Sequence, residues 1–163
     1  MRTPFLKNYF IVVLIFSSCK QRGKDVKNNA LPLNNLKQHT IELKNIADSL
    51  YNQDNYSLAI KYLDTLIKID STSGENYFMR GYCYDQVYKH SELSQPISDY
   101  TRAINLNYKK GKTYFNLGLC YAVKNDSMAL ACFHKSLEAD PNHFQSAIQI
   151  EAIERRLELE KKR

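Results

Sequence analysis

A pattern of large and small residues recurs along this chain about every 34 residues, and it limits the fold more than any other sequence feature. Small residues mark the same point in three copies, at Ala47, Gly81 and Gly118, with intervals of 34 and 37 residues. In the clearest copy, Tyr114 and Tyr121 flank Gly118 at helical spacing. A period of this length predicts repeated units that stack along one direction.

Each copy is expected to form two packed antiparallel helices. The small residue on the first helix lets the second helix approach, and a large residue three positions later fills the space between them. Because one pair cannot bury its apolar side alone, three pairs are expected to share a core. Small Ala59, Ala103 and Ala129 belong to the second helices, and Leu50, Tyr84 and Tyr121 are the large residues. The expected helices cover residues 40–53, 56–69, 75–88, 95–106, 111–124 and 127–139.

The middle copy is about three residues longer than the first. The extra residues are best placed in the turn around Lys89–Leu93, between the two helices of that copy. Pro96 then falls in the first turn of the following helix, where a missing backbone N–H loses no hydrogen bond.

These copies resemble tetratricopeptide repeats. The family pattern has a large residue, Leu-Gly after two positions and Tyr after two more, then Ala-x3-Phe and a closing Pro; residues Tyr114 to Pro141 match it. The resemblance covers residues 40–143. It implies an all-α fold, an α-α superhelix of three helical hairpins with a C-terminal capping helix. The domain would span residues 39–163, with repeats at about 40–73, 74–110 and 111–143 and the capping helix at 144–163.

Residues 144–160 predict the closing helix through apolar residues spaced three or four apart, with charged residues elsewhere. The alternative is a dimerising helix, because Ile148 and Leu159 leave a second apolar side. The periodic apolar residues are Phe144, Ala147, Ile150, Ile153 and Leu157.

The resemblance also implies a partner-binding concave surface, formed mainly by the first helix of each pair. Aromatic side chains dominate its middle and suit an extended peptide or a partner helix. The alternative is that several of these rings belong to the core. The expected groove residues are Lys44, Asp48, Tyr51 and Asn52, then Phe78, Tyr82, Asp85 and Gln86, then Lys112, Phe115, Leu119, Ala122 and Val123.

Some tetratricopeptide domains hold a C-terminal carboxylate with a lysine and an asparagine from the first pair and basic residues from the third. Lys44 and Lys112 match that arrangement, but Asp48 stands in the place of the asparagine and Asn116 in that of a basic residue. A carboxylate would meet a like charge at Asp48, so this mode of binding is not expected.

The first residues have the order of an export signal. Arg2 and Lys7 precede the apolar run Phe10–Phe16, which is too short to span a bilayer. Ser17 and Ser18 then precede Cys19, and Phe-Ser-Ser-Cys resembles the lipobox of bacterial lipoproteins. This resemblance implies a signal peptide over residues 1–18 and a lipid on Cys19, with an ordinary signal peptide or an uncleaved anchor as the alternatives.

The net charge of +6 does not come from the repeats. Residues 39–163 carry 16 basic and 16 acidic residues, which gives no electrostatic indication of nucleic acid binding. Residues 19–38 are rich in basic residues and predict a polar tether beside an anionic membrane, or simply a solvated tail. Lys20 after the cysteine favours an outer-membrane location facing the periplasm, with surface exposure as an alternative.

No arrangement of residues predicts catalysis, a cofactor or a metal. The closest pair of metal-ligating types, Cys132 and His134, lies two residues apart on a helix, so the two side chains point in different directions. Cys83, Cys120 and Cys132 are expected to be free thiols packed between helices. The alternative is a disulfide between Cys120 and Cys132, which lie about equally far from the turn that joins their antiparallel helices.

The expected function is therefore that of a non-enzymatic, membrane-anchored scaffold. It would bind other envelope proteins during the assembly or regulation of a complex. The alternative is a module that binds glycan or peptidoglycan through the same aromatic residues.

Overall fold

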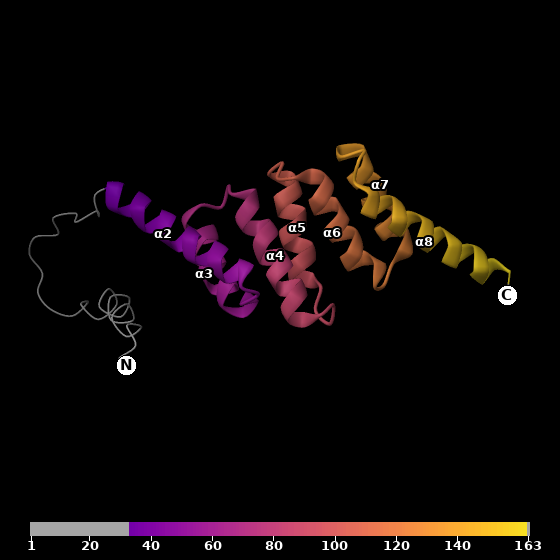
Figure 1. Cartoon of the computed structure of the whole chain (residues 1–163), viewed down its shortest axis with the longest axis horizontal. Helices are drawn as coiled ribbons and strands as arrows, with labels where there is room; N and C mark the ends of the chain where they lie inside the picture. Colours follow the sequence, from indigo (N-terminus) through magenta and orange to yellow (C-terminus); the bar gives the residue numbers. More distant parts are fainter. Residues whose placement is uncertain (1–32, 163) are drawn as a thin grey trace, which may run out of the picture. The chain divides into compact units, whose positions relative to one another are not determined.

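The computed structural model describes residues 33–162, and Figure 1 shows them as a series of packed helices. This part of the chain contains helices and no strand, which confirms the all-α prediction. The helices are α2 (Leu33–Asn52), α3 (Tyr56–Ile69), α4 (Gly74–Tyr88), α5 (Ser94–Asn105), α6 (Lys110–Ala122), α7 (Asp126–Ala139) and α8 (Phe144–Lys161). The expected signal peptide, Cys19 and the tether as far as residue 32 lie outside the described residues.

The helices form the three expected hairpins, α2–α3, α4–α5 and α6–α7, and end with α8. The second helix of each hairpin also packs on the helix that follows: α3 on α4, α5 on α6, and α7 on α8. Each second helix is therefore shared by two neighbours, and the apolar interior continues from one hairpin into the next.

The small residues of the repeat stand where two helices of a hairpin meet. Ala47 is fully buried, as expected. A Cβ atom added at Gly118 would lie 2.6 Å from a ring carbon of Phe133, and one added at Gly81 would lie 3.3 Å from a ring carbon of Tyr100. Real Cβ contacts are longer than the first distance, so the ring of Phe133 occupies space that only glycine leaves open.

Helix α2 begins at Leu33 and not near residue 40, so it includes residues 33–38, the last part of the segment expected to form the polar tether. Leu36, Leu43 and Leu50 are spaced by seven and share one side of the helix. Leu36 is 42% exposed, so it adds little to the core. The first turns of α2 thus continue the seven-residue apolar spacing but make few contacts with the core. This explains why the helix was not expected to begin before residue 40.

The extra residues of the middle repeat lie in the turn where they were expected. Residues 89–93 join α4 to α5. The corresponding turns of the other two hairpins are shorter: residues 53–55 join α2 to α3, and residues 123–125 join α6 to α7. Lys89 and His90 have φ angles of 46° and 66°, in the left-handed region that non-glycine residues seldom adopt. Pro96 is buried in the first turn of α5, as the sequence indicated.

A buried ion network joins three helices in the middle of the array. Arg80 of α4 donates to Asp99 of α5 through Nε and Nη2, at 2.9 and 2.7 Å, and to Asp64 of α3 through Nη1 at 2.7 Å. The side chains of Arg80 and Asp99 are only 15% and 2% exposed. Arg80 occupies the repeat position that Leu117 fills in α6. The middle hairpin therefore has a charged side chain where the third has an apolar one.

Helix α8 repeats the register of α4 and α6. Ser146 is buried at the position of Asn76 and Thr113, and Ile150 is buried at the position of Leu117. Glu151, however, stands where the other helices have Gly81 and Gly118. A long side chain there prevents a second helix from approaching as closely as in the hairpins, in keeping with a closing role for α8.

Within residues 33–162, no helix combines the length and the apolar character needed to cross a membrane.

Candidate binding groove

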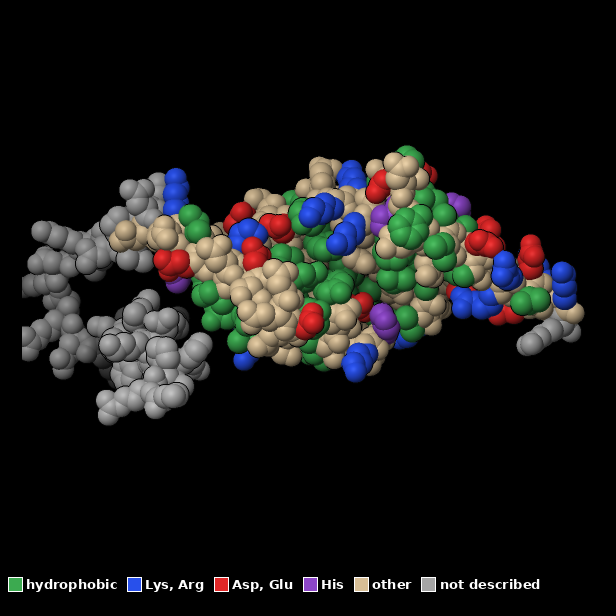
Figure 2. All heavy atoms as spheres, viewed as in Figure 1, with side chains coloured by type: hydrophobic (Ala, Val, Ile, Leu, Met, Phe, Trp, Pro, Cys, Tyr) green, Lys and Arg blue, Asp and Glu red, His purple; other side chains and the backbone are tan. Residues whose placement is uncertain are grey.

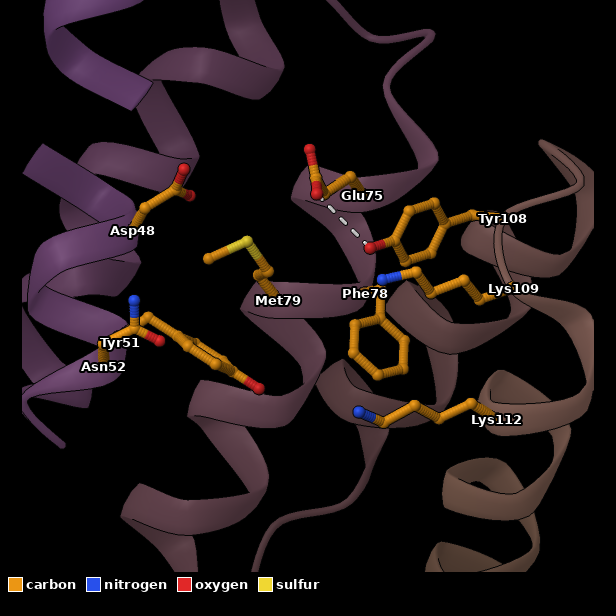
Figure 3. Close-up of a pocket in the computed structure, with 9 residues that line it drawn as sticks. All are labelled: Asp48, Tyr51, Asn52, Glu75, Phe78, Met79, Tyr108, Lys109 and Lys112. Atoms are coloured by element: carbon orange, nitrogen blue, oxygen red, sulfur yellow. Dashed lines mark hydrogen bonds between the residues drawn. The ribbon is translucent and has the colours of Figure 1, made fainter. Parts of the chain in front are cut away.

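A cavity of about 260 Å³ opens between the first helices of the three hairpins (Figure 3). Its lining comes from α2, α4, α6 and the connection between α5 and α6, so it exists only because the hairpins stack. We call this cavity and its lining residues the groove. They are Asp48, Tyr51, Asn52, Glu75, Phe78, Met79, Tyr108, Lys109 and Lys112.

The groove has an acidic wall and a basic wall. Asp48 and Glu75 lie on the side of α2 and α4, and Lys109 and Lys112 reach in from the opposite side (Figure 3). Lys44, at the edge, donates to Glu75 Oε2 at 2.6 Å and lies 3.6 Å from Asp48. The hydrogen bond from Lys44 holds the pKa of Glu75 below its usual value. The charge of the acidic wall is thus partly neutralised by Lys44. Among the described residues no carboxylate forms an ion pair with Lys109 or Lys112, although the charge of Lys109 also contributes to the lowered pKa of Glu75.

The rings of the groove combine an apolar floor with exposed edges. Phe78 is 4% exposed and packs against Tyr100 and Tyr108, with ring centroids 5.8 and 5.5 Å away. Lys112 Nζ lies 5.6 Å from the Phe78 ring centroid, within range of a cation–π contact. Tyr51 is half-buried, and burial raises the pKa of its hydroxyl. This floor is rigid because each ring is held by another.

Five of the residues expected at the binding surface line the groove together: Asp48, Tyr51, Asn52, Phe78 and Lys112. Lys44 borders it through its bond to Glu75. Tyr82 lies beside the groove and packs against Tyr51, with ring centroids 5.3 Å apart. The groove therefore brings together expected residues from α2, the first half of α4 and the start of α6.

The remaining expected residues lie elsewhere. Phe115 packs against Phe133 and His143, and half-buried Leu119 and Ala122 join the same cluster, so these residues contribute to the core of the third hairpin. Gln86 is exposed at the end of α4. Val123 is 48% exposed and lines a shallower hollow with Asp126 and Arg156.

Asp85 is a buried carboxylate at the base of α4. Its Oδ1 lies 2.8 Å from Nδ1 of His90 but accepts no hydrogen bond of good geometry. Burial raises the pKa of Asp85, and His90 opposes that effect. Burial is the main cause of the raised pKa of Tyr100 and of Cys120, and the charge of Asp85 adds to both. Asp85 was expected at the binding surface, but it lies beneath it.

Four groove residues were not predicted: Glu75, Met79, Tyr108 and Lys109. Tyr108 and Lys109 belong to a connection, and the expected set was drawn from first helices only. Tyr108 donates to Glu75 Oε1 at 3.3 Å, so the connection is bonded to the start of α4. The run Tyr108-Lys-Lys-Gly-Lys112 was the available signal, since basic residues cluster there beside an aromatic ring.

The three described cysteines, Cys83, Cys120 and Cys132, are free and buried, so the disulfide considered for Cys120 and Cys132 is not present. Burial raises the pKa of the Cys83 and Cys120 thiols to about 12, which leaves them protonated and unreactive at neutral pH. Among residues 33–162, no cluster of His, Cys, Asp or Glu is arranged to hold a metal ion.

Solved structures share this arrangement of hairpins. The first TPR domain of Spaghetti (RPAP3), bound to the HSP90 peptide SRMEEVD, matches with a TM-score of 0.65 at 23% identity, over 74% of this chain and 94% of that one. This chain has the tetratricopeptide-repeat fold. At this level of identity, the likeness of the tetratricopeptide domains is one of architecture.

Two further solved structures agree. The Yersinia enterocolitica type III secretion chaperone SycD, in complex with a peptide of the translocator YopD, matches with a TM-score of 0.66 at 18% identity, over 78% of this chain and 98% of that one. The Sgt2 TPR domain from Aspergillus fumigatus matches with a TM-score of 0.65 at 20% identity, over 77% and 83%. No protein-family model and no curated protein sequence matches the chain.

Proposed function

We propose that this chain is a lipid-anchored tetratricopeptide scaffold of the bacterial cell envelope whose groove binds a segment of another protein. The observation that carries the proposal is the groove itself, in which Tyr51, Phe78 and Lys112 from three hairpins converge on one cavity. Similar structures hold peptides of HSP90 and of the translocator YopD, which supports a peptide as the occupant. The scaffold would assist the assembly or regulation of an envelope complex.

The charges of the groove select the chemistry of the segment. An apolar side chain fits against Phe78 and Met79, and an acidic group fits beside Lys109 and Lys112. A C-terminal carboxylate held by Lys44 is disfavoured, because that ammonium group is already bonded to Glu75 at 2.6 Å. The proposed ligand is thus an internal segment with an apolar residue followed or preceded by an acidic one.

Photocrosslinking in the native cell tests the groove. A photoreactive residue at position 112 is expected to yield a discrete protein adduct, identified by mass spectrometry, whereas one at position 135 is not. Lys135 is a matched control, because its Nζ lies over the ring of Tyr114 at 5.7 Å, much as Lys112 lies over Phe78. Lys135 does not line the groove but a separate hollow, together with Tyr114 and Glu138. Equal labelling from both positions would reject the groove as the binding site.

A charge reversal gives an independent measurement. Lys112→Glu is expected to weaken capture of the crosslinked partner by about tenfold, and Lys135→Glu to leave it unchanged, with circular dichroism showing that both variants are folded. If the chain instead sediments with purified cell wall and Lys112→Glu leaves that sedimentation intact, a glycan-binding module replaces the protein scaffold.

Lipid attachment is tested separately from binding. Metabolic labelling with palmitate is expected to mark the wild-type chain, and Cys19→Ala is expected to abolish both the label and the recovery of the chain in the outer-membrane fraction. A Cys19→Ala chain that remains labelled and in that fraction would contradict the proposed anchor without affecting the groove.

A further inference from the structure

Helix α8 carries the most exposed large hydrophobic side chains among the described residues. Phe144, Leu159 and Ile148 are 65%, 59% and 55% exposed. Scattered apolar residues are normal on a surface, but these three belong to a single helix at the open end of the array. Such a concentration indicates an interaction surface.

The three side chains share one side of α8. At about 100° per residue they fall within one sector, together with Ala152, opposite the buried Ile150 and Ile153 that face α7. Arg155 falls in the same sector and Glu151 at its edge, and Figure 2 shows apolar and charged side chains together on the end of α8. Helix α8 therefore has two apolar sides, of which α7 covers one. Because Glu151 stands at the place of Gly118, the second side is closed to the tight hairpin packing used elsewhere in the fold.

The uncovered side of α8 is complementary to itself when two copies run antiparallel. With the two-fold axis between Ile153 and Glu154, Ile148 of one copy lies opposite Leu159 of the other. Small Ala152 lies near the axis, where two helices approach most closely. Glu151 and Arg155, which are 2.8 Å apart within one chain, come within reach of Arg155 and Glu151 of the second copy.

We propose that α8 pairs with α8 of a second copy in an antiparallel, two-fold symmetric dimer. Ile148 of each copy then contacts Leu159 of the other, so the same contact occurs twice, as a two-fold interface requires. None of the residues that line the groove belongs to α8, so both grooves remain available. Two linked grooves raise the effective concentration of binding sites for a partner with repeated segments.

Disulfide crosslinking of the full-length chain in its native membranes tests the geometry. The double variant Ile148→Cys, Leu159→Cys is expected to form a covalent dimer on a non-reducing gel. Neither single variant is expected to do so, because antiparallel pairing separates equivalent positions by about 16 Å along the helix. The pair Met128→Cys, Leu159→Cys is the control, since Met128 is 43% exposed but lies on α7. The wild-type chain gives the background from the native cysteines.

Each other result overturns the proposal. Crosslinking by Ile148→Cys alone would indicate parallel pairing or random collision, and crosslinking by the control pair as efficiently as by the test pair would indicate non-specific contact. Absence of crosslinking by the test pair would show that α8 does not pair in this way.

A charge variant checks the pairing by another route. Glu151→Arg in the test-pair background is expected to lower the crosslinked yield about fivefold, and adding Arg155→Glu is expected to restore it. All these positions are exposed, so circular dichroism should show an unchanged helix content. A yield that does not respond to Glu151→Arg would contradict the proposed register.

Discussion

The hairpins α4–α5 and α6–α7 have the same fold but different interiors. Where α4 has Arg80, bonded to Asp99, α6 has Leu117. One turn after the glycine, α4 has the buried carboxylate Asp85 and α6 has Ala122. The glycine itself is common to both, at Gly81 and Gly118.

The difference separates what the fold requires from what it tolerates. Close approach of two helices is required, and Gly81 and Gly118 provide it in both hairpins. The residue before the glycine can be charged or apolar, as Arg80 and Leu117 show, provided that a charge buried at that position is paired. The middle hairpin therefore depends on the pairing of Arg80 with Asp99, and the third depends on the packed volume of Leu117.

The largest expected effect is the loss of Arg80. Arg80→Ala leaves Asp99, 2% exposed, as a buried charge without its partner, and should lower the free energy of unfolding by about 4 kcal/mol. Leu117→Ala at the equivalent place should cost about 3 kcal/mol, through a cavity. Urea unfolding followed by circular dichroism measures both. A milder effect for Arg80→Ala than for Leu117→Ala would show that the ion network matters less than the packed core.

A double variant sharpens this comparison. Arg80→Leu combined with Asp99→Ala makes the middle hairpin resemble the third and leaves no buried charge at this point. Its stability is expected to lie within about 1 kcal/mol of the native chain, because apolar replacements of buried ion pairs are often neutral. If the double variant is as unstable as Arg80→Ala, the network has a structural role beyond charge compensation.

The two glycines are expected to respond differently to alanine. Gly118→Ala brings a Cβ within 2.6 Å of the fully buried Phe133 ring and should destabilise the domain by about 2 kcal/mol. Gly81→Ala meets its nearest atoms at 3.1 and 3.3 Å, so the gain in helix propensity offsets much of the strain and the net effect should stay below about 1 kcal/mol. Thermal unfolding of the two variants ranks them, and the reverse order would contradict this account of the hairpin contact.

The smallest expected effect concerns Asp85 and depends on pH. Burial raises its pKa in the folded state, so its contribution to stability is present at low pH and is lost as the pH rises through that raised pKa. Asp85→Asn should therefore stabilise the domain by about 1 kcal/mol at pH 7 and by nothing near about pH 3, where the carboxyl is protonated in both states. Melting temperatures from pH 3 to pH 8 test this, and a gain that is equal at both ends would exclude the buried charge as its cause.

The repeat pattern predicts most of the fold because it records where helices touch. Ala47, Gly81 and Gly118 mark the contacts within hairpins, and these contacts fix the number and order of helices. The longer turn of the middle repeat was also visible, since an interval of 37 residues in place of 34 needs an insertion where helices are not interrupted.

The sequence does not reveal which polar residues pair across helices. Arg80 and Asp99 are 19 residues apart, and nothing in their spacing shows that they meet. Only part of the lining of the groove was predicted, because the contacts between separate elements are not visible in the sequence. Residues of the first helices follow the repeat, whereas Tyr108 and Lys109 belong to a connection whose path depends on the packing of α4 against its neighbours.

The start of α2 at Leu33 shortens the linker between the helical domain and Cys19, the proposed anchor. Residues 20–32 then separate lipid from helix, and a fully extended chain of that length reaches about 45 Å. Residues 33–39 add about 10 Å as helix, so residue 40 lies at most about 55 Å from the anchor, compared with about 70 Å for a chain extended as far as that residue. The proposed anchor thus confines the groove to a thin layer next to the bilayer, and the segment that it binds has to come to that layer.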